Sequence, residues 1–321
     1  MGRIQVMSEV LANQIAAGEV VERPASCVKE LVENSLDAQA RHVRVVLEEG
    51  GIARILVQDD GTGMDEADLV LATARHATSK VRHVRDLQRI QTLGFRGEAL
   101  ASIAAVARVR LASRPHGAEQ GVEVQVEGGE RTNGPRPVGM PPGTVVEVRD
   151  LFYNTPARLK YLRAVQTEQA RCLEVLQRAA LARPDVGFRC ETGGRVLWQT
   201  PGDSRPLSVM AALFGAGEAG QLLHVARATA DYRIEAWIGR PTQARSSRAH
   251  AHLFVNRRPI RNPAIHQAVV AAFGQRLMTG RHPLYVMYLE MDPALVDVNV
   301  HPHKSEVRFS EERDLTALVQ R

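Results

Sequence analysis

The stretch KELVENSLD, residues 29–37, constrains this chain more than any other because its structure follows from its spacing. Pro24 stands where a helix can begin, since its fixed φ and missing N–H cost nothing in a first turn. Apolar residues then recur with the 3.6-residue period of one helical face, at Val28, Leu31, Val32 and Leu36. The spacing predicts a helix over roughly 24–37 with one buried face.

The opposite face of this predicted helix carries four polar groups, Glu30, Glu33, Asn34 and Asp37. Their spacings of three, four and seven residues place them on one stripe. Three carboxylates and a carboxamide on one stripe repel one another unless a cation or a hydrogen-bonded partner lies between them. The stripe therefore predicts a site for a metal ion with a phosphate.

Composition excludes several classes of protein. A chain of 321 residues usually forms more than one domain, and 44% hydrophobic residues are enough for packed cores. Only 4% are aromatic, which argues against base stacking as the main binding device. No run approaches the ~18 apolar residues of a membrane helix, and the N-terminus lacks the apolar core of a signal peptide. The three cysteines, Cys27, Cys172 and Cys190, form no CxxC motif, so we expect unpaired thiols, a cytoplasmic location and no membrane partner.

The distribution of charge points to a nucleic acid. The net charge is +5 and the isoelectric point is 9.4. The number of arginines says little by itself, because four lysines against 37 arginines indicate a general bias toward arginine. More informative is the span between Glu235 and Glu290, which has no acidic residue and eight arginines: Arg240, Arg245, Arg248, Arg257, Arg258, Arg261, Arg276 and Arg281. Such a one-signed segment suits a phosphate backbone. The alternative is a solvated basic face without a partner.

The order of predicted elements indicates an α+β chain of two domains. The first begins with a short helix that Ser8 can cap and that ends at Gly18. It is followed by the stripe helix, two paired strands and a helix, and then by a long mobile loop at 78–97. After this loop come a helix, antiparallel strands, an amphipathic helix and two more strands. TPGDSRP at 200–206 is the linker candidate. We expect one domain over 1–200, a linker over 201–206 and a second α/β domain over 207–321.

Eight sequence blocks carry a resemblance to a known family. The chain has neither a P-loop nor a GxGxxG motif after a strand, so a nucleotide must be held by other means. KELVENSLDA, DDGTGM, RHATSK and TLGFRGEALASI resemble the GHKL ATPases, which include gyrase, Hsp90, histidine kinases and MutL. LANQIAAGEVVERPAS, DLFYNTPARLKYLR, FVNRRPI and VDVNVHPHKSEVRF are similar to the N-terminal ATPase region of the MutL mismatch-repair family, and the likeness runs from Ile4 to Phe309. The resemblance implies a GHKL (Bergerat) α/β sandwich followed by a smaller, ribosomal-protein-S5-like α/β domain.

The resemblance assigns catalytic roles on the stripe. It implies that Glu30 is the general base and that Asn34 is a Mg²⁺ ligand, and residues four apart do share a helical face. Glu33 is the rival base, but it lies about 100° around a helix from Asn34, so Glu30 is preferred. Asp37 either orients other pocket groups or is a solvated helix charge. Lys304, in HPHK, is implied to lie on the γ-phosphate and to stabilise the charge of phosphoryl transfer.

The same resemblance assigns the nucleotide-binding residues. Asp59 is implied to accept a hydrogen bond from the adenine amino group, which would discriminate against guanine. Gly61 and Gly63 would let the backbone approach the base, and Thr144 matches the adenine-side threonine. The lid over the phosphates would comprise Gly94, Phe95, Arg96, Gly97 and Glu98, with donors from Thr78, Ser79 and Lys80. Outside this context, DDGTG would be an ordinary hairpin bend and GFRG a plain helix start.

The function that the resemblance implies is a slow ATPase that works as a switch, with ATP and Mg²⁺ as cofactors. Nucleotide would order the lid and residues 1–20, and two such regions would associate. The expected partners are a MutS-type mismatch-recognition protein and the DNA backbone, the latter through Lys160, Arg163, Arg245, Arg248, Arg257, Arg258 and Arg261. Such a protein would be cytoplasmic and associated with the nucleoid. The alternative is a nucleotide-regulated DNA-binding scaffold whose hydrolysis is incidental. A nuclease site is not expected within this chain.

Overall fold

A computed structural model describes residues 7, 9–74, 77–80, 97–297 and 308–320. The chain forms two compact units, residues 1–180 with 184–205, and residues 181–183 with 206–321. The short segment 181–183 joins the second unit, where the hydroxyl of Tyr288 donates a hydrogen bond to the carbonyl of Leu181 at 2.8 Å. The sequence prediction did not include this segment, because a contact between residues 107 positions apart leaves no local signal.

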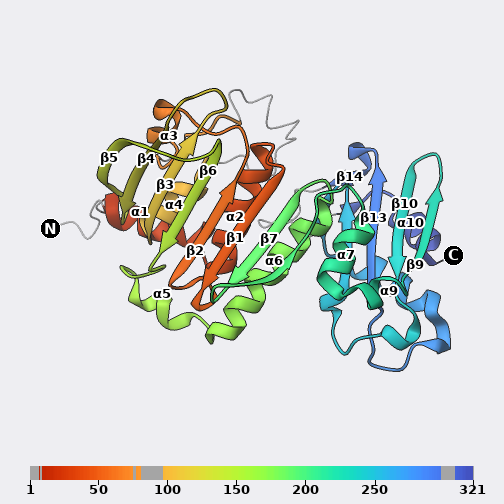
Figure 1. Ribbon diagram of the computed structural model, residues 1–321. Helices are drawn as coiled ribbons and strands as arrows, with labels where there is room; N and C mark the ends of the chain where they lie inside the picture. The colour runs from red at the N-terminus through yellow and green to blue at the C-terminus, as the bar shows by residue number, and fades with distance from the viewer. Residues whose placement is uncertain (1–6, 8, 75–76, 81–96, 298–307, 321) are drawn as a thin grey trace. The chain divides into compact units, whose positions relative to one another are not determined.

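The first unit is built on one eight-stranded sheet, ordered β5-β4-β3-β6-β2-β1-β7-β8. Neighbouring strands are antiparallel except for β1 and β7, which are parallel. The strands are β1 His42–Glu48, β2 Arg54–Asp59, β3 Arg108–Arg114, β4 Gly121–Glu127, β5 Glu130–Val138, β6 Gly143–Arg149, β7 Gly187–Thr192 and β8 Arg195–Gln199. The helices are α1 Glu9–Val20, α2 Pro24–Asp37, α3 Glu66–Leu71, α4 Ala99–Ala105, α5 Pro156–Tyr161 and α6 Val165–Ala182. Figure 1 shows α2 and α4 behind one face of this sheet.

The core of the first unit lies between the sheet and its helices. Leu31 of α2 and Leu47 and Ile55 of the central strands are almost completely buried. Each such side chain contributes ~1.5–3 kcal/mol relative to an exposed one. The core also holds Cys27, Cys172 and Cys190 as free, buried thiols, which confirms the prediction of unpaired cysteines.

The opposite face of the sheet carries rows of ion pairs. Arg44 Nη2 lies 2.9 Å from Glu191 Oε2, and Arg54 Nε lies 2.5 Å from Glu147 Oε1. Hydrogen bonds from Arg44 and Arg189 lower the pKa of Glu191 to about 2. Many arginines of the first unit are therefore paired internally, and the arginine count alone overstates the charge open to a nucleic acid.

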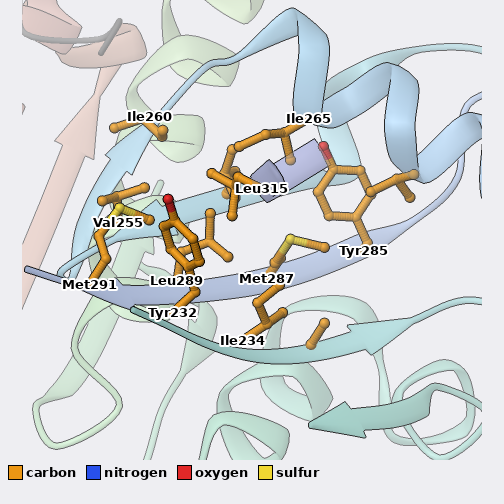
Figure 2. Close-up of a cluster of buried hydrophobic side chains, with 13 residues drawn as sticks. Tyr232, Ile234, Val255, Ile260, Ile265, Tyr285, Met287, Leu289, Met291 and Leu315 are labelled. Atoms are coloured by element: carbon orange, nitrogen blue, oxygen red, sulfur yellow. The ribbon is translucent and has the colours of Figure 1, made fainter. Parts of the chain in front are cut away.

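The second unit has a five-stranded sheet, ordered β12-β11-β13-β10-β9. Its strands are β9 Leu223–Ala228, β10 Tyr232–Ile238, β11 Ala251–Val255, β12 Arg258–Ile260 and β13 Tyr285–Met291, and β14 Val296–Asp297 pairs separately with β15 Arg308–Phe309. Its helices are α7 Pro206–Phe214, α8 Ala216–Ala219, α9 Pro263–Phe273 and α10 Glu312–Gln320. Figure 2 shows the core of this unit, where Ile265 of α9 and Leu315 of α10 pack with Met287 of β13.

Short 3₁₀ turns complete both units, at Glu49–Gly51, Pro241–Gln243, Arg248–His250, Gly274–Arg276 and Pro293–Leu295. Among the described residues, no helix combines the length and the apolar character that crossing a membrane requires.

Candidate functional site

Helix α2 carries the polar stripe that the spacing predicted. The helix has Pro24 in its first turn and buries Val28, Leu31, Val32 and Leu36. Its predicted range and its predicted buried face are both confirmed. The predicted crowding of polar groups is real, and the structure resolves it with lysine side chains.

Lys29 lies between two carboxylates of the stripe. Its Nζ is 3.1 Å from Glu30 Oε1 and 3.1 Å from Glu33 Oε2. Burial lowers the pKa of Lys29, but Glu33 and Glu30 outweigh this effect, so its pKa is above the ordinary value. Burial is also the main cause that raises the pKa of Glu33, with a smaller contribution from Glu30, while Lys29 opposes it. The charged form of the half-buried Glu33 carboxyl is thus less favourable than that of an exposed glutamate.

Lys80 supplies the second cation. Its Nζ is 2.9 Å from Asn34 Oδ1 and 2.6 Å from Asp37 Oδ2. Lys80 follows Thr78, whose Oγ1 accepts the Lys80 backbone N–H at 3.2 Å. The sequence predicted Lys80 as a phosphate donor but not its contact with the stripe, which spans more than forty residues of chain.

The end of strand β2 joins α2 through a half-buried carboxylate. Asp59 Oδ2 accepts a hydrogen bond from Ser35 Oγ at 2.7 Å, and Asp59 Oδ1 accepts the Gly61 N–H at 3.0 Å. Burial raises the pKa of the Asp59 carboxyl, although the bonds from Ser35 and Gly61 oppose the rise. Ser35 was missed in the sequence because a serine beside Asn34 carries no signal of its own.

The loop after Asp59 requires glycine where other backbone lies against it. Gly63 has φ of 71°, and a Cβ there would collide with the carbonyl oxygen of Arg114. Gly143, at the start of β6, has φ of 121°, and its Cβ would collide with the carbonyl oxygen of Asp59. A larger residue at Gly63 would displace the backbone at Arg114, and one at Gly143 would displace the backbone of Asp59 itself. Gly143 was missed in the sequence although it directly precedes Thr144.

Thr144 lies beside Asp59 across the β2–β6 pair. Its Oγ1 is 2.9 Å from the buried Ser113 Oγ, and that hydroxyl also accepts the Met64 N–H at 2.8 Å. Ser113 therefore ties the glycine loop to the sheet. An isolated serine in a strand offers no sequence signal for this role.

The structure thus joins part of the predicted site and leaves part outside the described residues. Hydrogen bonds and the β2–β6 pairing bring together residues of α2, the 78–80 segment and the end of β2, namely Glu30, Asn34, Asp37, Asp59, Gly61, Thr78, Lys80 and Thr144. Gly63 follows in the loop after Asp59. Ser79 lies between Thr78 and Lys80, and Gly97 and Glu98 precede α4. Gly94, Phe95, Arg96 and Lys304 lie outside the described residues.

The donor chemistry at Asn34 suits Mg²⁺. This ion prefers oxygen ligands and usually keeps water and phosphate oxygens besides one or two protein groups. Asn34 Oδ1 is such an oxygen, and it already accepts a hydrogen bond from a cation, the Lys80 ammonium group at 2.9 Å. No group of three or more His, Cys, Asp or Glu side chains suited to a metal occurs in the described part of the chain. The cluster therefore fits a metal carried in by a phosphate better than a cage made by the protein alone.

The predicted DNA-contact residues are distributed over both units. In the first unit, Lys160 is exposed on α5 and Arg163 is exposed just beyond it. In the second unit, Arg248, Arg257 and Arg261 are exposed, and Arg258 is half-buried. The Arg245 guanidinium forms an ion pair with Glu218. We therefore leave Arg245 out of the DNA contacts proposed below, because its charge already has an internal partner.

Two protein-family models match the chain. The model for histidine kinase-, DNA gyrase B- and HSP90-like ATPases matches residues 22–134, and the model for the DNA mismatch repair protein C-terminal domain matches residues 210–321. The B subunit of DNA gyrase from Myxococcus xanthus shares the fold, with a TM-score of 0.59 at 14% identity. The family model over residues 22–134 therefore identifies a GHKL-type ATPase domain in the first unit.

Closer relatives narrow this class. The Aquifex aeolicus MutL ATPase domain complexed with ADP is similar with a TM-score of 0.65 and 31% identity, over 85% of this chain and 94% of that one. The DNA mismatch repair protein MutL of Symbiobacterium thermophilum is 49% identical over 99% of this chain and 50% of its own length. That of Azotobacter vinelandii is 50% identical over 97% of this chain and 49% of its own. The chain belongs to the MutL family and contains its ATPase domain, and it spans about half the length of these curated relatives.

Proposed function

We propose that this chain binds ATP with Mg²⁺ on the polar face of α2, hydrolyses it slowly and acts as a nucleotide switch in DNA mismatch repair. One observation carries the proposal. Lys80 bonds the stripe residues Asn34 and Asp37, and Ser35, the next residue of α2 after Asn34, bonds the half-buried carboxylate of Asp59. A phosphate–metal site and a base-recognition site are thereby connected by adjacent residues of a single helix.

Glu30 is the proposed general base. The Lys29 ammonium, 3.1 Å away, orients its carboxylate. Glu30 then accepts a proton from a water aligned with the terminal phosphate. Bound Mg²⁺ would supply positive charge that offsets the charge of the phosphates, with Asn34 Oδ1 as its protein ligand. Glu33 is the less suitable base because it lies about 100° around the helix from Asn34.

Lys80 is proposed to exchange partners when nucleotide binds. Its ammonium contacts both Asn34 and Asp37, and Asn34 has to release it before binding a metal. A phosphate is a suitable new acceptor for the ammonium, with the hydroxyls of Thr78 and Ser79 as further donors. Asp37 would keep the lysine near the site during this exchange. Gly94, Phe95, Arg96, Gly97, Glu98 and Lys304 complete the proposed phosphate-binding set.

Asp59 is the proposed acceptor for the adenine amino group. Its two oxygens already accept bonds from Ser35 and Gly61, which fix the orientation of the carboxylate. Each carboxylate oxygen has a second lone pair, so a further donor can be accepted. Gly61 and Gly63 leave room beside it, and Thr144 lies on the adjacent strand.

The switch is proposed to work through association. Nucleotide would order the lid and residues 1–20, two N-terminal regions would then associate around DNA, and hydrolysis would release them. A MutS-type protein is the proposed source of the mismatch signal, and the location is the nucleoid of the cytoplasm. ATP hydrolysis by the 321-residue chain in the presence of Mg²⁺ tests the enzymatic part, and absence of turnover would contradict it.

The DNA part of the proposal predicts a defined salt dependence. Lys160 is exposed on α5 and is proposed to contact a phosphate of the backbone. Replacing it with alanine should weaken binding similarly for different DNA sequences and reduce the slope of log K against log salt by about 1. Arg171→Ala is the control, because Arg171 is exposed on α6 and outside the proposed set. Fluorescence anisotropy across a salt series measures both slopes, and an unchanged slope for Lys160→Ala would remove it from the interface.

A further inference from the structure

Arg158, on helix α5, extends its side chain to the N-terminal helix α1. Its Nη2 donates to the carbonyl oxygen of Gln14 at 2.8 Å and lies 3.4 Å from that of Ile15. These residues are 143 and 144 positions away in sequence. A charged donor on a main-chain carbonyl makes a stronger hydrogen bond than a neutral one. The contact therefore fixes the position of α1 relative to α5 at one point.

Gly18 makes this approach feasible. A Cβ at Gly18 would lie 2.8 Å from Cζ of Arg158 and would collide with Nη2. The sequence prediction that the helix ends at Gly18 is wrong, because α1 continues to Val20. Glycine inside a helix is less favourable than alanine. Close approach of the guanidinium is the physical reason that a glycine is suited to this position.

The segment that carries Arg158 also contacts α4. Asn154 Nδ2 donates to the carbonyl of Ala105, in the last turn of α4, at 2.9 Å. The Phe152 N–H donates to the carbonyl of Val106 at 2.7 Å. Helix α4 begins directly after Gly97 and Glu98, where the predicted lid ends. Residues 152–160 thus connect the helix after the lid, the N-terminal helix and the exposed Lys160.

The guanidinium of Arg158 is not fully satisfied in this position. Its Nη1 is buried and has no hydrogen-bond partner among the described residues. A buried charged donor without an acceptor opposes the contact. The unsatisfied Nη1 therefore offsets part of the stabilisation that the contact with Gln14 gives.

We propose that Arg158 is a positioning residue that couples α1 to α5, so that nucleotide-dependent ordering of the N-terminal residues changes the affinity for DNA at Lys160. This inference rests on the proposed function, in which α1 responds to ATP and Lys160 contacts DNA. Linkage requires the effect to be reciprocal, so DNA has to change the affinity for nucleotide by the same factor.

The coupling is measured by four affinities of the 321-residue chain. DNA affinity is determined with and without a non-hydrolysable ATP analogue, and analogue affinity with and without a DNA duplex. For the wild type we expect a coupling factor of about 5 to 100. For Arg158→Ala we expect a factor close to 1, with each ligand still bound. Arg171→Ala, an arginine truncation on α6, should keep the wild-type factor.

Each result decides between defined alternatives. Equal coupling factors for Arg158→Ala and wild type would overturn the inference, as would a wild-type factor of 1 with both ligands bound. Failure of the wild type to bind the analogue or DNA would instead contradict the proposed function. Loss of both affinities in Arg158→Ala would show a structural role for Arg158 and overturn the coupling role.

A double-mutant cycle tests the contact without any ligand. Gly18→Ala should lower the thermal unfolding temperature of the wild type, because the methyl group displaces the guanidinium. In the Arg158→Ala background the same substitution should raise the unfolding temperature, because alanine is the better helix former. This reversal of sign is specific to the contact. A Gly18→Ala effect of the same sign and size in both backgrounds would show that Arg158 and Gly18 do not interact.

Discussion

Replacing Glu30 with alanine is expected to reduce ATP turnover by about 10²–10⁴-fold, the usual contribution of a general base. Binding of ATP should persist, because the proposed metal ligand Asn34 and the adenine-side Asp59 are unchanged. The loss would arise because no other carboxylate of the stripe has the same spacing to Asn34. Single-turnover phosphate release, with ATP affinity measured separately, distinguishes hydrolysis from binding.

Glu33 provides the matched control for this experiment. It lies on the same helix and its carboxylate bonds the same lysine, with Lys29 Nζ 3.1 Å from each glutamate. Glu33→Ala should therefore reproduce any indirect effect of disturbing Lys29 while retaining the proposed base. If Glu30→Ala hydrolyses ATP like the wild type, or if Glu33→Ala shows the larger loss of turnover, the assignment of Glu30 is wrong.

Replacing Asp59 with asparagine is expected to weaken ATP binding by roughly 10- to 100-fold, the value of one hydrogen bond to a charged group. The preference for ATP over GTP should also fall, since a carboxamide N–H can face the keto oxygen of guanine. Titration calorimetry with both nucleotides measures the two effects. An unchanged ATP affinity would exclude Asp59 from the adenine site.

The same substitution should have the opposite effect on stability. Burial raises the pKa of Asp59 in the folded chain, so the ionised carboxylate destabilises the fold at pH values above this folded pKa. That penalty is relieved as the pH falls through the folded pKa. Asp59→Asn removes it at neutral pH and should raise the midpoint of chemical denaturation there, with a smaller gain near pH ~4, close to the pKa of an unperturbed aspartate. A lower midpoint at neutral pH would show that the charge is stabilised in the fold.

Asp60 is the control for both measurements on Asp59. It is the next residue, but its carboxylate bonds the start of β1, where Oδ1 accepts the backbone N–H groups of Arg41 and His42 at 2.7 and 2.8 Å. Burial is the largest single effect and raises the pKa of Asp60, but the interactions with His42 and Arg41 together outweigh it, so the pKa lies below the ordinary value. Asp60→Asn should therefore leave nucleotide affinity near the wild-type value and reduce stability at neutral pH.

The helix of the site could be predicted because its information is local. Periodicity alone fixed the extent of α2, its buried face and its polar stripe. The contact of Lys80 with the stripe could not be predicted, because Lys80 and Asn34 are 46 residues apart in the chain. Ser35 and Ser113 were missed for a similar reason, since a hydroxyl shows its role only once its acceptor or donor is placed in space.

Other differences have equally specific causes. Strand β5, Glu130–Val138, was not predicted because it contains a glycine and two prolines and is almost entirely exposed, as an edge strand can be. Gly18 was interpreted as a helix end, because a contact with Arg158 cannot be seen in sequence. The basic segment of the second unit overstated the free charge, since Arg245 pairs with Glu218 outside that segment.

The central claim is that ATP drives association of the N-terminal regions, and sedimentation velocity of the 321-residue chain tests it most directly. The chain is measured alone and with Mg²⁺ and a saturating non-hydrolysable ATP analogue, with Asp59→Asn at the same analogue concentration as a binding-deficient control. The account predicts a monomer alone, a dimer with the analogue and a largely monomeric Asp59→Asn. A wild-type chain that binds the analogue and remains a monomer would contradict the account.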